Sequence, residues 1–427
     1  VGGLVAYQAP SYTSITNSYL NTETTGQATS AGGGTGLTTA QMFSADSFTG
    51  FEFGEVWGNA GDQITPYLLG LSGNQVFNRH DLPSGTITAT NRPDAYNVIL
   101  TLQQLQAINS GLTGNYVLGA DIDASATAGW NSGAGFDPIG SSYSNSFRGV
   151  FDGLGHVISD LFIDRGATES VGLFGFADGA TLRQVGLENV DITGQNLVGG
   201  LVGGQWYSSI SHSYATGAVT GSNDVGGLVG AQTGSSISQS YAIGEVQGGV
   251  DVGGLVGYLD NGSISQSYAS ASVDGNNRVG GLVGTQASGD ISESYATGEV
   301  RGNNIVGTLI GNSSGTISNS YYLLTDNRTI ESTDFGVNTR GGVRVASGLT
   351  GKTLTLKGGL GISLLDSVEL GDNALLVQTD GRIFLRSGST VTSSAAGDAL
   401  VLAGVTFINQ ADRSALSATN ADGRWLI

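Results

Sequence analysis

Residues 198–230, VGGLVGGQWYSSISHSYATGAVTGSNDVGGLVG, contain one full copy of a 27-residue repeat and the start of the next copy. The opening VGGLVG returns at 225, 252 and 279, and its first valine returns again at 306. Three series of identical residues keep this spacing: Val198, Val225, Val252, Val279 and Val306; Ile210, Ile237, Ile264 and Ile291; Tyr214, Tyr241, Tyr268 and Tyr295. A fixed period of this size indicates a solenoid, in which each repeat buries its apolar face only against its neighbours.

The composition of each repeat favours β-strands over helices. Glycine recurs about every fifth residue, and each glycine would destabilise a helix interior by roughly 1 kcal/mol. The apolar runs are short and bounded by Gly, Asn, Asp and Ser, which is typical of strands and turns. Strands stacked in parallel lie about 4.8 Å apart. The sequence therefore predicts an all-β fold, a right-handed parallel β-helix with coils of about 27 residues, each with three short strands and three corners.

The constant spacing follows from strand register. A residue 27 positions later lies directly above its predecessor, so the Val, Ile and Tyr series predict ladders along the solenoid axis, with apolar ladders inside. An insertion within a strand would turn its side chains to the wrong face, so length changes are expected in corners. The segment 311–317 is one residue shorter than 284–291, and the loss falls in a Ser/Gly turn.

One position does not fit simple alternation. A variable polar residue lies midway between each ladder Ile and the following Tyr and shares their parity, so we expect a bend or bulge there. This position holds His212, Gln239, Gln266, Glu293 and Asn319.

Composition limits the class of protein. The 427 residues carry a net charge of −19, and the only lysines are Lys352 and Lys357. This balance argues against binding to nucleic acid or anionic membranes. The chain has no cysteine, which excludes disulfides and fits export across a bacterial envelope in an unfolded state. No apolar run is long enough for a transmembrane helix, and no signal peptide is recognisable. Because the chain opens on VGGLVAY, which is text from within a repeat, we interpret it as part of a longer protein.

Shifts in composition divide the chain into six predicted segments. Residues 1–70 are the end of a first solenoid block, closed by an aromatic terminator with Phe48, Phe51, Phe53 and Trp57. Residues 71–97, with Pro83 and Pro93, form a linker. Residues 98–170 contain a capping helix, predicted over 100–108, and irregular first coils. Regular coils follow over 171–322, a connector over 323–344, and further coils of a different repeat length over 345–427.

The repeated text SISQSYA (236–242) followed by GGLVG resembles the GLUG repeats of large bacterial adhesins. The segment LQAINSGLTGNYVLGADID (105–123) looks like the usual lead-in to such repeats, and LTTAQMFSADSFTGFEF (37–53) looks like the usual terminator after them. The closing ATNADGRWLI (418–427) looks like the passage before the C-terminal modules of filamentous haemagglutinin-type exoproteins. The resemblance covers most of the chain outside 71–97. It implies a secreted or outer membrane-associated β-helical protein, exported by a two-partner (type V) transporter and acting in adhesion or biofilm matrix. The secretion domain of that family is absent from this sequence.

Parallel β-helices also serve as polysaccharide-degrading enzymes, and glycoside hydrolysis needs two carboxylates about 5–10 Å apart. Asp121 and Asp123 share a strand face, and Asp137, Asp152 and Asp160 follow. The alternative interpretation, which we favour, is turn formation, because Asp accepts backbone hydrogen bonds at corners. The histidines, His80, His156 and His212, show no metal-ligand spacing. No nucleophile elbow is present, so no catalytic residue is predicted.

Two further groups of residues are candidates for binding. Asp224 and Asp251 stack at one corner and could hold Ca²⁺, although Arg278 occupies the next ligand position. Turn formation is the alternative. No other cofactor is predicted. Trp206, Tyr207 and Tyr258 follow GLVG cores and are candidate sugar-stacking residues, or else cover the edge of a ladder.

We therefore predict a non-catalytic rod segment of a secreted or cell-surface bacterial adhesin that mediates cell adhesion, aggregation or biofilm attachment. Its expected partners are exopolysaccharide or a host or bacterial surface glycan, another copy of itself, and the outer-membrane transporter. A β-helical polysaccharide-degrading enzyme and a passive spacer stalk remain as alternatives. Convergent carboxylates would favour the enzyme, uniform coils the spacer, and exposed aromatic residues the binding protein.

Overall fold

The computed structural model describes residues 15–28, 30, 33–69, 71, 73–82, 94–326, 328–332, 336–345, 349–404, 406–411, 415–418 and 423–426. The chain forms two compact units, unit 1 with residues 1–122 and 149–156, and unit 2 with residues 123–148 and 157–427. The repeat opening expected at residues 1–5, the linker prolines Pro83 and Pro93, and residues 419–422 and 427 of the closing segment lie outside the described residues.

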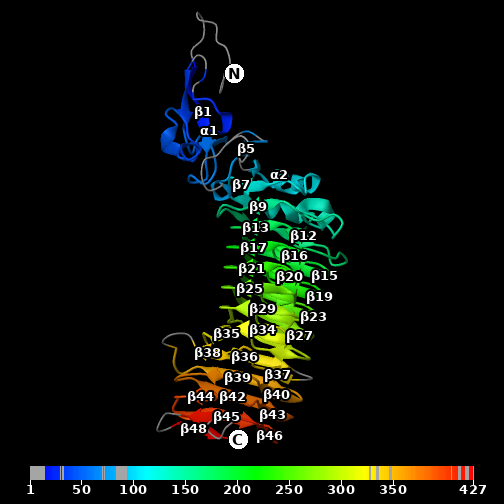
Figure 1. Cartoon of the computed structure of the whole chain (residues 1–427). Helices are drawn as coiled ribbons and strands as arrows, with labels where there is room; N and C mark the ends of the chain where they lie inside the picture. The colour runs from blue at the N-terminus through cyan, green and yellow to red at the C-terminus, as the bar shows by residue number, and fades with distance from the viewer. Residues whose placement is uncertain are drawn as a thin grey trace, which may run out of the picture. The chain divides into compact units, whose positions relative to one another are not determined.

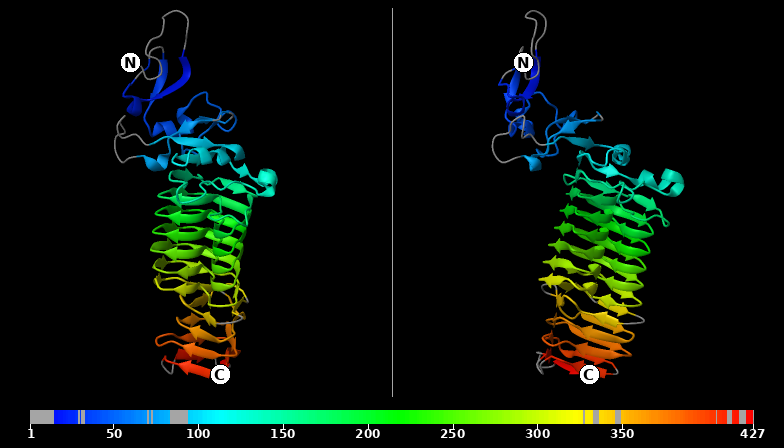
Figure 2. Two further views of the ribbon diagram at one scale, coloured as in Figure 1. Left: turned by 90° about the vertical axis from the view of Figure 1, so that its right-hand side faces the viewer. Right: turned by 45° about the vertical axis from the view of Figure 1, so that its right-hand side comes forward.

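Unit 2 confirms the predicted all-β parallel solenoid, with about nine turns of about 27 residues each (Figures 1 and 2). Each regular coil contains four strands, as in β15 (Asn196–Gly199), β16 (Val202–Trp206), β17 (Ser209–Ser211) and β18 (Tyr214–Thr220). We expected three. The fourth arises because the chain bends sharply at His212 and its equivalents, which splits one expected strand into β17 and β18.

Each of the four strands pairs in parallel with its copy in the next coil, which gives four sheets. Sheet 1 contains β15, β19 (Asn223–Gly226), β23 (Val250–Gly253), β27 (Asn277–Gly280), β32 (Val306–Gly307), β37 (Gly336–Asn338), β40 (Gly361–Leu364), β43 (Arg382–Leu385) and β46 (Thr406–Asn409). Sheet 2 contains β12 (Phe174–Asp178), β16, β20 (Val229–Thr233), β24 (Val256–Asp260), β28 (Val283–Gln286) and β33 (Ile310–Ser313). Sheet 3 contains, within unit 2, β13 (Thr181–Arg183), β17, β21 (Ser236–Ser238), β25 (Gly262–Ser265), β29 (Gly289–Ser292) and β34 (Thr316–Ser318).

Sheet 4 is the longest. It contains β10 (Val157–Ser159), β11 (Phe162–Asp164), β14 (Gly186–Thr193), β18, β22 (Tyr241–Gln247), β26 (Tyr268–Gly275), β30 (Tyr295–Ala296), β31 (Val300–Gly302), β35 (Tyr321–Leu324), β36 (Arg328–Ser332), β38 (Val343–Val345), β39 (Thr353–Gly358), β41 (Val368–Glu369), β42 (Ala374–Thr379), β44 (Val391–Ser393), β45 (Gly397–Ala403), β47 (Leu416–Ala418) and β48 (Gly423–Leu426). The 3-10 segment η5 (Ser125–Gly133) precedes these coils.

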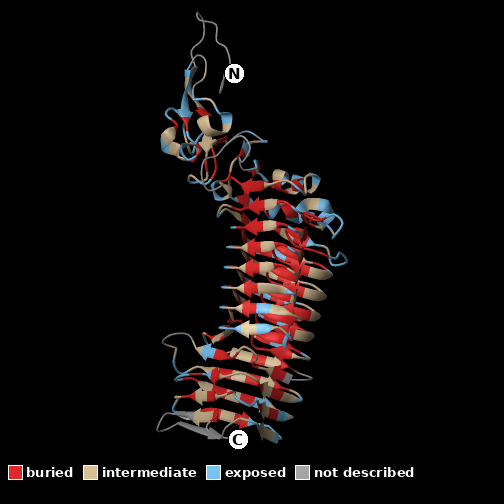
Figure 3. Ribbon diagram, viewed as in Figure 1, coloured by how far each residue is buried: buried red, intermediate tan, exposed pale blue. Residues whose placement is uncertain are grey.

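The register of the strands agrees with the repeat. Ile237 pairs with Ile264, and Val252 pairs with Val279, so residues 27 positions apart stack directly. The five valines and four isoleucines of the two ladders are all buried, and red segments recur along the strands of successive coils in Figure 3. The single-residue deletion falls between β33 and β34, as expected, because Gln286 pairs with Ser313 while Asp290 pairs with Thr316.

The predicted tyrosine ladder is present, and unlike the valine and isoleucine ladders it lies on the outside of the coils. Each of its rings is half-buried and stacks on the next, with centroids 4.8 to 5.0 Å apart between Tyr214 and Tyr295. The stack continues to Tyr321, over which the Arg344 guanidinium lies at 4.6 Å.

The expected bend explains this outward position. The residue two before each ladder tyrosine has a left-handed backbone, with φ of +46° to +51° at His212, Gln239, Gln266, Glu293 and Asn319. The bend turns the next serine inward and the tyrosine outward. The inward serines form a hydrogen-bonded ladder: Ser213 N–H donates to Ser240 Oγ at 3.1 Å, and Ser240 Oγ–H donates to the Ser238 carbonyl at 2.7 Å.

The coils after Tyr321 continue sheets 1 and 4 with other steps. Val306 pairs with Val337, a step of 31 residues, and Thr353 pairs with Ala374, a step of 21 residues. The pairing within both sheets nevertheless remains parallel, because the changes in length lie between strands.

Unit 1 is less regular. It contains β1 (Ile15–Asn21), α1 (Thr22–Thr25), β2 (Gly33–Leu37), η1 (Gln41–Phe43), η2 (Ala45–Ser47), β3 (Trp57–Gly58), β4 (Tyr67–Leu68), β5 (Gln75–Val76), η3 (Arg79–Asp81), β6 (Tyr96–Ile99), α2 (Leu102–Ala107), η4 (Ile108–Ser110), β7 (Tyr116–Leu118) and β9 (Val150–Asp152), and β8 (Ile122–Asp123) leads to unit 2. The helix predicted over 100–108 is present as α2, with a capping box between Thr101 and Gln104. The terminator aromatics pack together, with Phe51 and Trp57 stacked at 4.2 Å.

Candidate functional site

An open polar trough crosses five successive coils of unit 2 beside sheet 3 and has a volume of about 550 Å³. Each coil contributes two or three consecutive residues. The lining is Gly179, Ala180, Thr181, Tyr207, Ser208, Ser209, Gly234, Ser235, Ser236, Asn261, Gly262, Ser263, Gly289 and Asp290. Tyr207 is the large side chain in this set, and it is 68% exposed. The trough is therefore a polar surface with one prominent aromatic ring.

The repeat explains how Tyr207 comes to this position. Tyr207, Gly234 and Asn261 follow one another at 27-residue intervals, and all three have a left-handed backbone, with φ of +48°, +58° and +49°. This conformation favours Gly and Asn and is unusual for a bulky residue. A Cβ added to Gly234 would lie 2.8 Å from the Tyr207 ring, so the ring lies over the glycine of the next coil. The absence of a side chain at Gly234 leaves room for the tyrosine.

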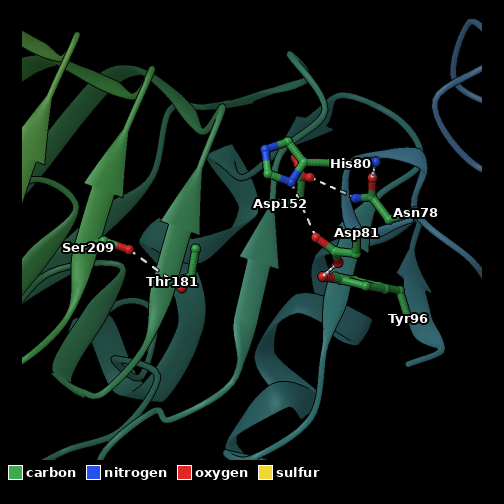
Figure 4. A network of polar contacts seen from close by, with 7 residues as sticks. All are labelled: Asn78, His80, Asp81, Tyr96, Asp152, Thr181 and Ser209. Carbon is green, nitrogen blue, oxygen red and sulfur yellow. Dashed lines mark hydrogen bonds and ion pairs between the residues drawn. The ribbon is translucent and has the colours of Figure 1, made fainter. Parts of the chain in front are cut away.

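Hydrogen bonds between serines hold the floor of the trough. Ser208 N–H donates to Ser235 Oγ at 3.1 Å, and Ser208 Oγ–H donates to the Trp206 carbonyl at 2.7 Å. Both serines are buried. In the outer row, Ser209 Oγ–H donates to Thr181 Oγ1 at 3.4 Å (Figure 4). The buried serines fix the backbone, while the following serines present hydroxyl groups to the trough.

The other two candidate aromatics do not line the trough. Trp206 is half-buried in an aromatic cluster, with ring centroids 5.2 Å from Phe176 and 4.7 Å from Tyr143. Tyr143 is 51% exposed, so this cluster forms a separate apolar patch. Tyr258 is half-buried on β24, and burial raises the pKa of its hydroxyl, with a smaller contribution from Asp260. Of the three residues, the structure therefore brings only Tyr207 into the trough.

The two candidate calcium ligands, Asp224 and Asp251, lie near the guanidinium group of Arg278. The Arg278 guanidinium donates two hydrogen bonds to the Asp251 carboxylate, both at 2.6 Å, and Thr285 also donates to this carboxylate. Burial, and next the charge of Asp251, raise the pKa of Asp224 to about 6, while Arg278 acts in the opposite direction. Within the part of the chain that the structure describes, no three His, Asp or Glu side chains are grouped as metal ligands. The geometry therefore gives no support to a calcium site at these two residues.

The carboxylates considered for catalysis form hydrogen bonds or ion pairs with other residues of the chain. Asp123 accepts a hydrogen bond from Ser125 N–H, and Asp121 lies 3.0 Å from His156. Asp137 pairs with Arg165 at 3.2 Å, and Asp160 accepts from Asn189 at 2.5 Å.

Asp152 belongs to a polar network of unit 1 (Figure 4). It is buried, accepts from Asn78 Nδ2 at 2.7 Å, and caps a turn by accepting from Leu154 N–H. In the same network, Asp81 interacts with His80 at 3.2 Å and accepts from the Tyr96 hydroxyl. Asp123 and Asp152 thus make the turn contacts that we favoured for the candidate carboxylates, whereas the other three contact side chains distant in the sequence.

Two other hollows lie on the last coils. One is polar and is lined in part by Glu331, Lys357, Gln378 and Asp380. The other is more apolar and is lined in part by Leu360, Phe384 and Ile408.

Comparisons with known proteins agree with the repeat. Residues 194–220, 221–247, 248–274 and 275–301 each match the GLUG motif. Over 206 residues the chain is 37% identical to halomucin of Haloquadratum walsbyi, a match that covers 45% of this chain and 2% of halomucin. The chain thus corresponds to a small part of that relative. A crystal structure from Bacteroides ovatus, provisionally named an immunoglobulin A1 protease, has 20% identity and a TM-score of 0.44, covering 60% of this chain and 80% of that one. None of the helices in the described residues is long and apolar enough to cross a membrane.

Most residues of the trough were not predicted from the sequence. Neither Asn261 nor Asp290 was predicted to be a binding residue, and no individual serine was assigned to a site. The signal was present for Asn261, because it lies two repeats after Tyr207. The concave shape was not visible in the sequence, because it depends on the corner residues being small in several stacked coils.

Proposed function

We propose that this chain is a non-catalytic segment of a large secreted or cell-surface protein, and that it mediates attachment by binding carbohydrate. The observation that carries the proposal is Tyr207. It is an aromatic ring exposed over a polar trough at a repeat position where the next two coils have Gly234 and Asn261. Sugar-binding surfaces combine an aromatic face with nearby hydroxyl, amide and carboxylate groups, and the trough offers this combination.

Three further features support the proposal. The four GLUG segments and the match to one stretch of halomucin fit a segment of a larger repeat protein. The chain contains no cysteine, so it could be exported in an unfolded state without forming disulfides on the way. The carboxylates considered for hydrolysis are held in turns and ion pairs, which favours binding over cleavage. Export through a two-partner transporter, attachment to exopolysaccharide and a role in biofilm are parts of the same proposal.

A glycan array tests the proposal. The chain is applied with and without Ca²⁺, and every bound polysaccharide is afterwards analysed for cleavage products. We expect binding to at least one class of glycan, no shortening of the polysaccharide and no dependence on Ca²⁺. Cleavage would instead identify a polysaccharide-degrading enzyme. Absence of binding would favour a passive spacer.

A further inference from the structure

The trough has the dimensions of a site for an extended polymer. Its lining runs from Gly179 to Asp290 over five coils. Neighbouring coils are 4.8 Å apart, as measured between the stacked rings of Tyr214 and Tyr241. Four such steps give a length of about 19 Å along the solenoid axis. Because one coil step is comparable to the length of one sugar ring, a site of this length suits about four consecutive sugars.

The chemistry of the trough selects among glycans. Asp290 is the one ionisable group in the lining apart from the tyrosine hydroxyl, and the whole chain carries a net charge of −19. This field repels polyanionic polysaccharides and provides no cation to pair with them. The remaining polar groups are Ser and Thr hydroxyls, the Asn261 amide and backbone groups, which suit sugar hydroxyls. The trough is therefore matched to an uncharged glycan.

The position of Tyr207 defines how the glycan lies. Its ring covers Gly234 in the coil that follows, and it belongs to the second of the five coils. A sugar ring stacked on Tyr207 would be followed by further sugars over Asn261 and towards Asp290. A chain crossing the solenoid at a right angle would meet the lining of only one coil.

Resting on the proposed function, we propose that the trough binds an uncharged linear glycan of about four sugars, which lies parallel to the solenoid axis with one sugar ring stacked on Tyr207. Neither the GLUG match nor the similarity to halomucin assigns a ligand or a site. In this arrangement Tyr207 provides the specific contact with the glycan, and the serines that line the trough provide less specific contacts.

The experiment measures binding of purified chain by calorimetry. The uncharged probes are cellohexaose, laminarihexaose, mannohexaose and N-acetylchitohexaose, each with its dimer and tetramer. The anionic probes are alginate and polygalacturonate. We expect one uncharged series to bind, with an affinity that rises from the dimer to the tetramer. The hexamer should bind with an affinity within twofold of the tetramer. Addition of 0.5 M salt should also change the affinity by less than twofold. Tyr207→Gly should weaken binding at least tenfold, whereas Tyr207→Phe and the control Tyr258→Phe should stay within twofold to threefold of wild type.

Folding is monitored in the same variants. Glycine adopts the left-handed backbone of residue 207 without strain, so Tyr207→Gly should melt at the same or a higher temperature than wild type. Loss of binding therefore cannot be attributed to unfolding. If a glycan binds but Tyr207→Gly binds it equally, or if the polyanions bind best, the inference is wrong while the proposed function stands. If wild type binds none of the probes and no glycan on the array, both are wrong.

Discussion

Replacement of Gly254 by alanine tests how the coils stack. Gly254 belongs to a column with Gly200, Gly227 and Gly281, in which each glycine faces the backbone of the coil that follows. A Cβ on Gly254 would lie 2.2 Å from the Gly281 carbonyl oxygen and 2.8 Å from the Ala269 Cβ. Both of these neighbours are rigid, since one is backbone and the other is the first atom of a side chain.

The expected cost follows from this geometry. Cβ atoms essentially never approach another atom closer than 3.0 Å, so the Gly281 carbonyl would have to withdraw by about 0.8 Å. Because the clash pushes Gly254 and the backbone at Gly280–Gly281 apart, it strains the hydrogen bond from Gly254 N–H to the Gly280 carbonyl, now 3.3 Å long. Displacement of Gly254 itself also strains the bond from Gly227 N–H to the Gly254 carbonyl, now 3.2 Å long. Two weakened backbone hydrogen bonds and an overpacked corner together predict a loss of about 3–5 kcal/mol.

The matched control is Gly166→Ala, because a Cβ at Gly166 would meet only a Thr193 methyl group at 3.8 Å. Urea unfolding followed by circular dichroism gives the free energy of unfolding, and hydrogen exchange shows whether the loss is local to residues 225–285. We expect Gly166→Ala to change stability by less than about 1 kcal/mol. The reasoning is refuted if Gly254→Ala unfolds at the same urea concentration as wild type and the control.

The remaining predictions concern single interactions. The unfolded chain protonates Asp near pH 3.9, whereas the pKa of Asp224 in the folded chain is about 6, so this group makes stability fall as the pH rises from about 4 to 6. Asp224→Asn should therefore raise the free energy of unfolding by up to about 2 kcal/mol at pH 7.5 and by little at pH 4, and an equal gain at both values would contradict this assignment. Arg278→Gln leaves the Asp251 carboxylate buried without its cation and should cost about 2–4 kcal/mol in urea unfolding, most of which Asp251→Asn should restore in the double variant. Ser240→Ala removes the acceptor of Ser213 N–H and should cost about 1–2 kcal/mol, whereas the outward Ser238→Ala should change stability by less than about 0.5 kcal/mol.

The fold could be predicted because every copy of the repeat independently indicates the same strand register. The spacing of Val225, Val252 and Val279 sufficed to place these residues in one buried ladder. The face on which the tyrosine ladder lies could not be predicted, since alternation along a strand assumes an extended backbone, and the left-handed residue at Gln239 interrupts it. The polar variability at that position indicated a bend, but a bend alone does not show which of the next residues turns inward.

The candidate site was harder to predict than the fold. Tyr207 was identified as an exposed aromatic from its place in the sequence, whereas Trp206, its immediate neighbour, turned out to pack on Phe176. Asp251 and Arg278 are 27 residues apart, so the repeat placed them in neighbouring coils, and the structure shows that they form an ion pair. The trough itself depends on the stacking of small corner residues from five coils, and no single repeat contains that information.

The glycine column has a consequence for how the length of this protein can change. From Gly200 to Gly281, consecutive coils meet through the same backbone contacts, and the column ends at Thr308, where the next coil departs from the 27-residue step. Deletion or duplication of one 27-residue copy would therefore recreate interfaces that already exist. Gain or loss of whole copies can thus lengthen or shorten the solenoid in increments of about 4.8 Å without a new type of backbone interface. A copy removed between Tyr207 and Asn261 would also shorten the trough by one increment. The length of the solenoid and the length of the glycan that fits the trough would therefore change together.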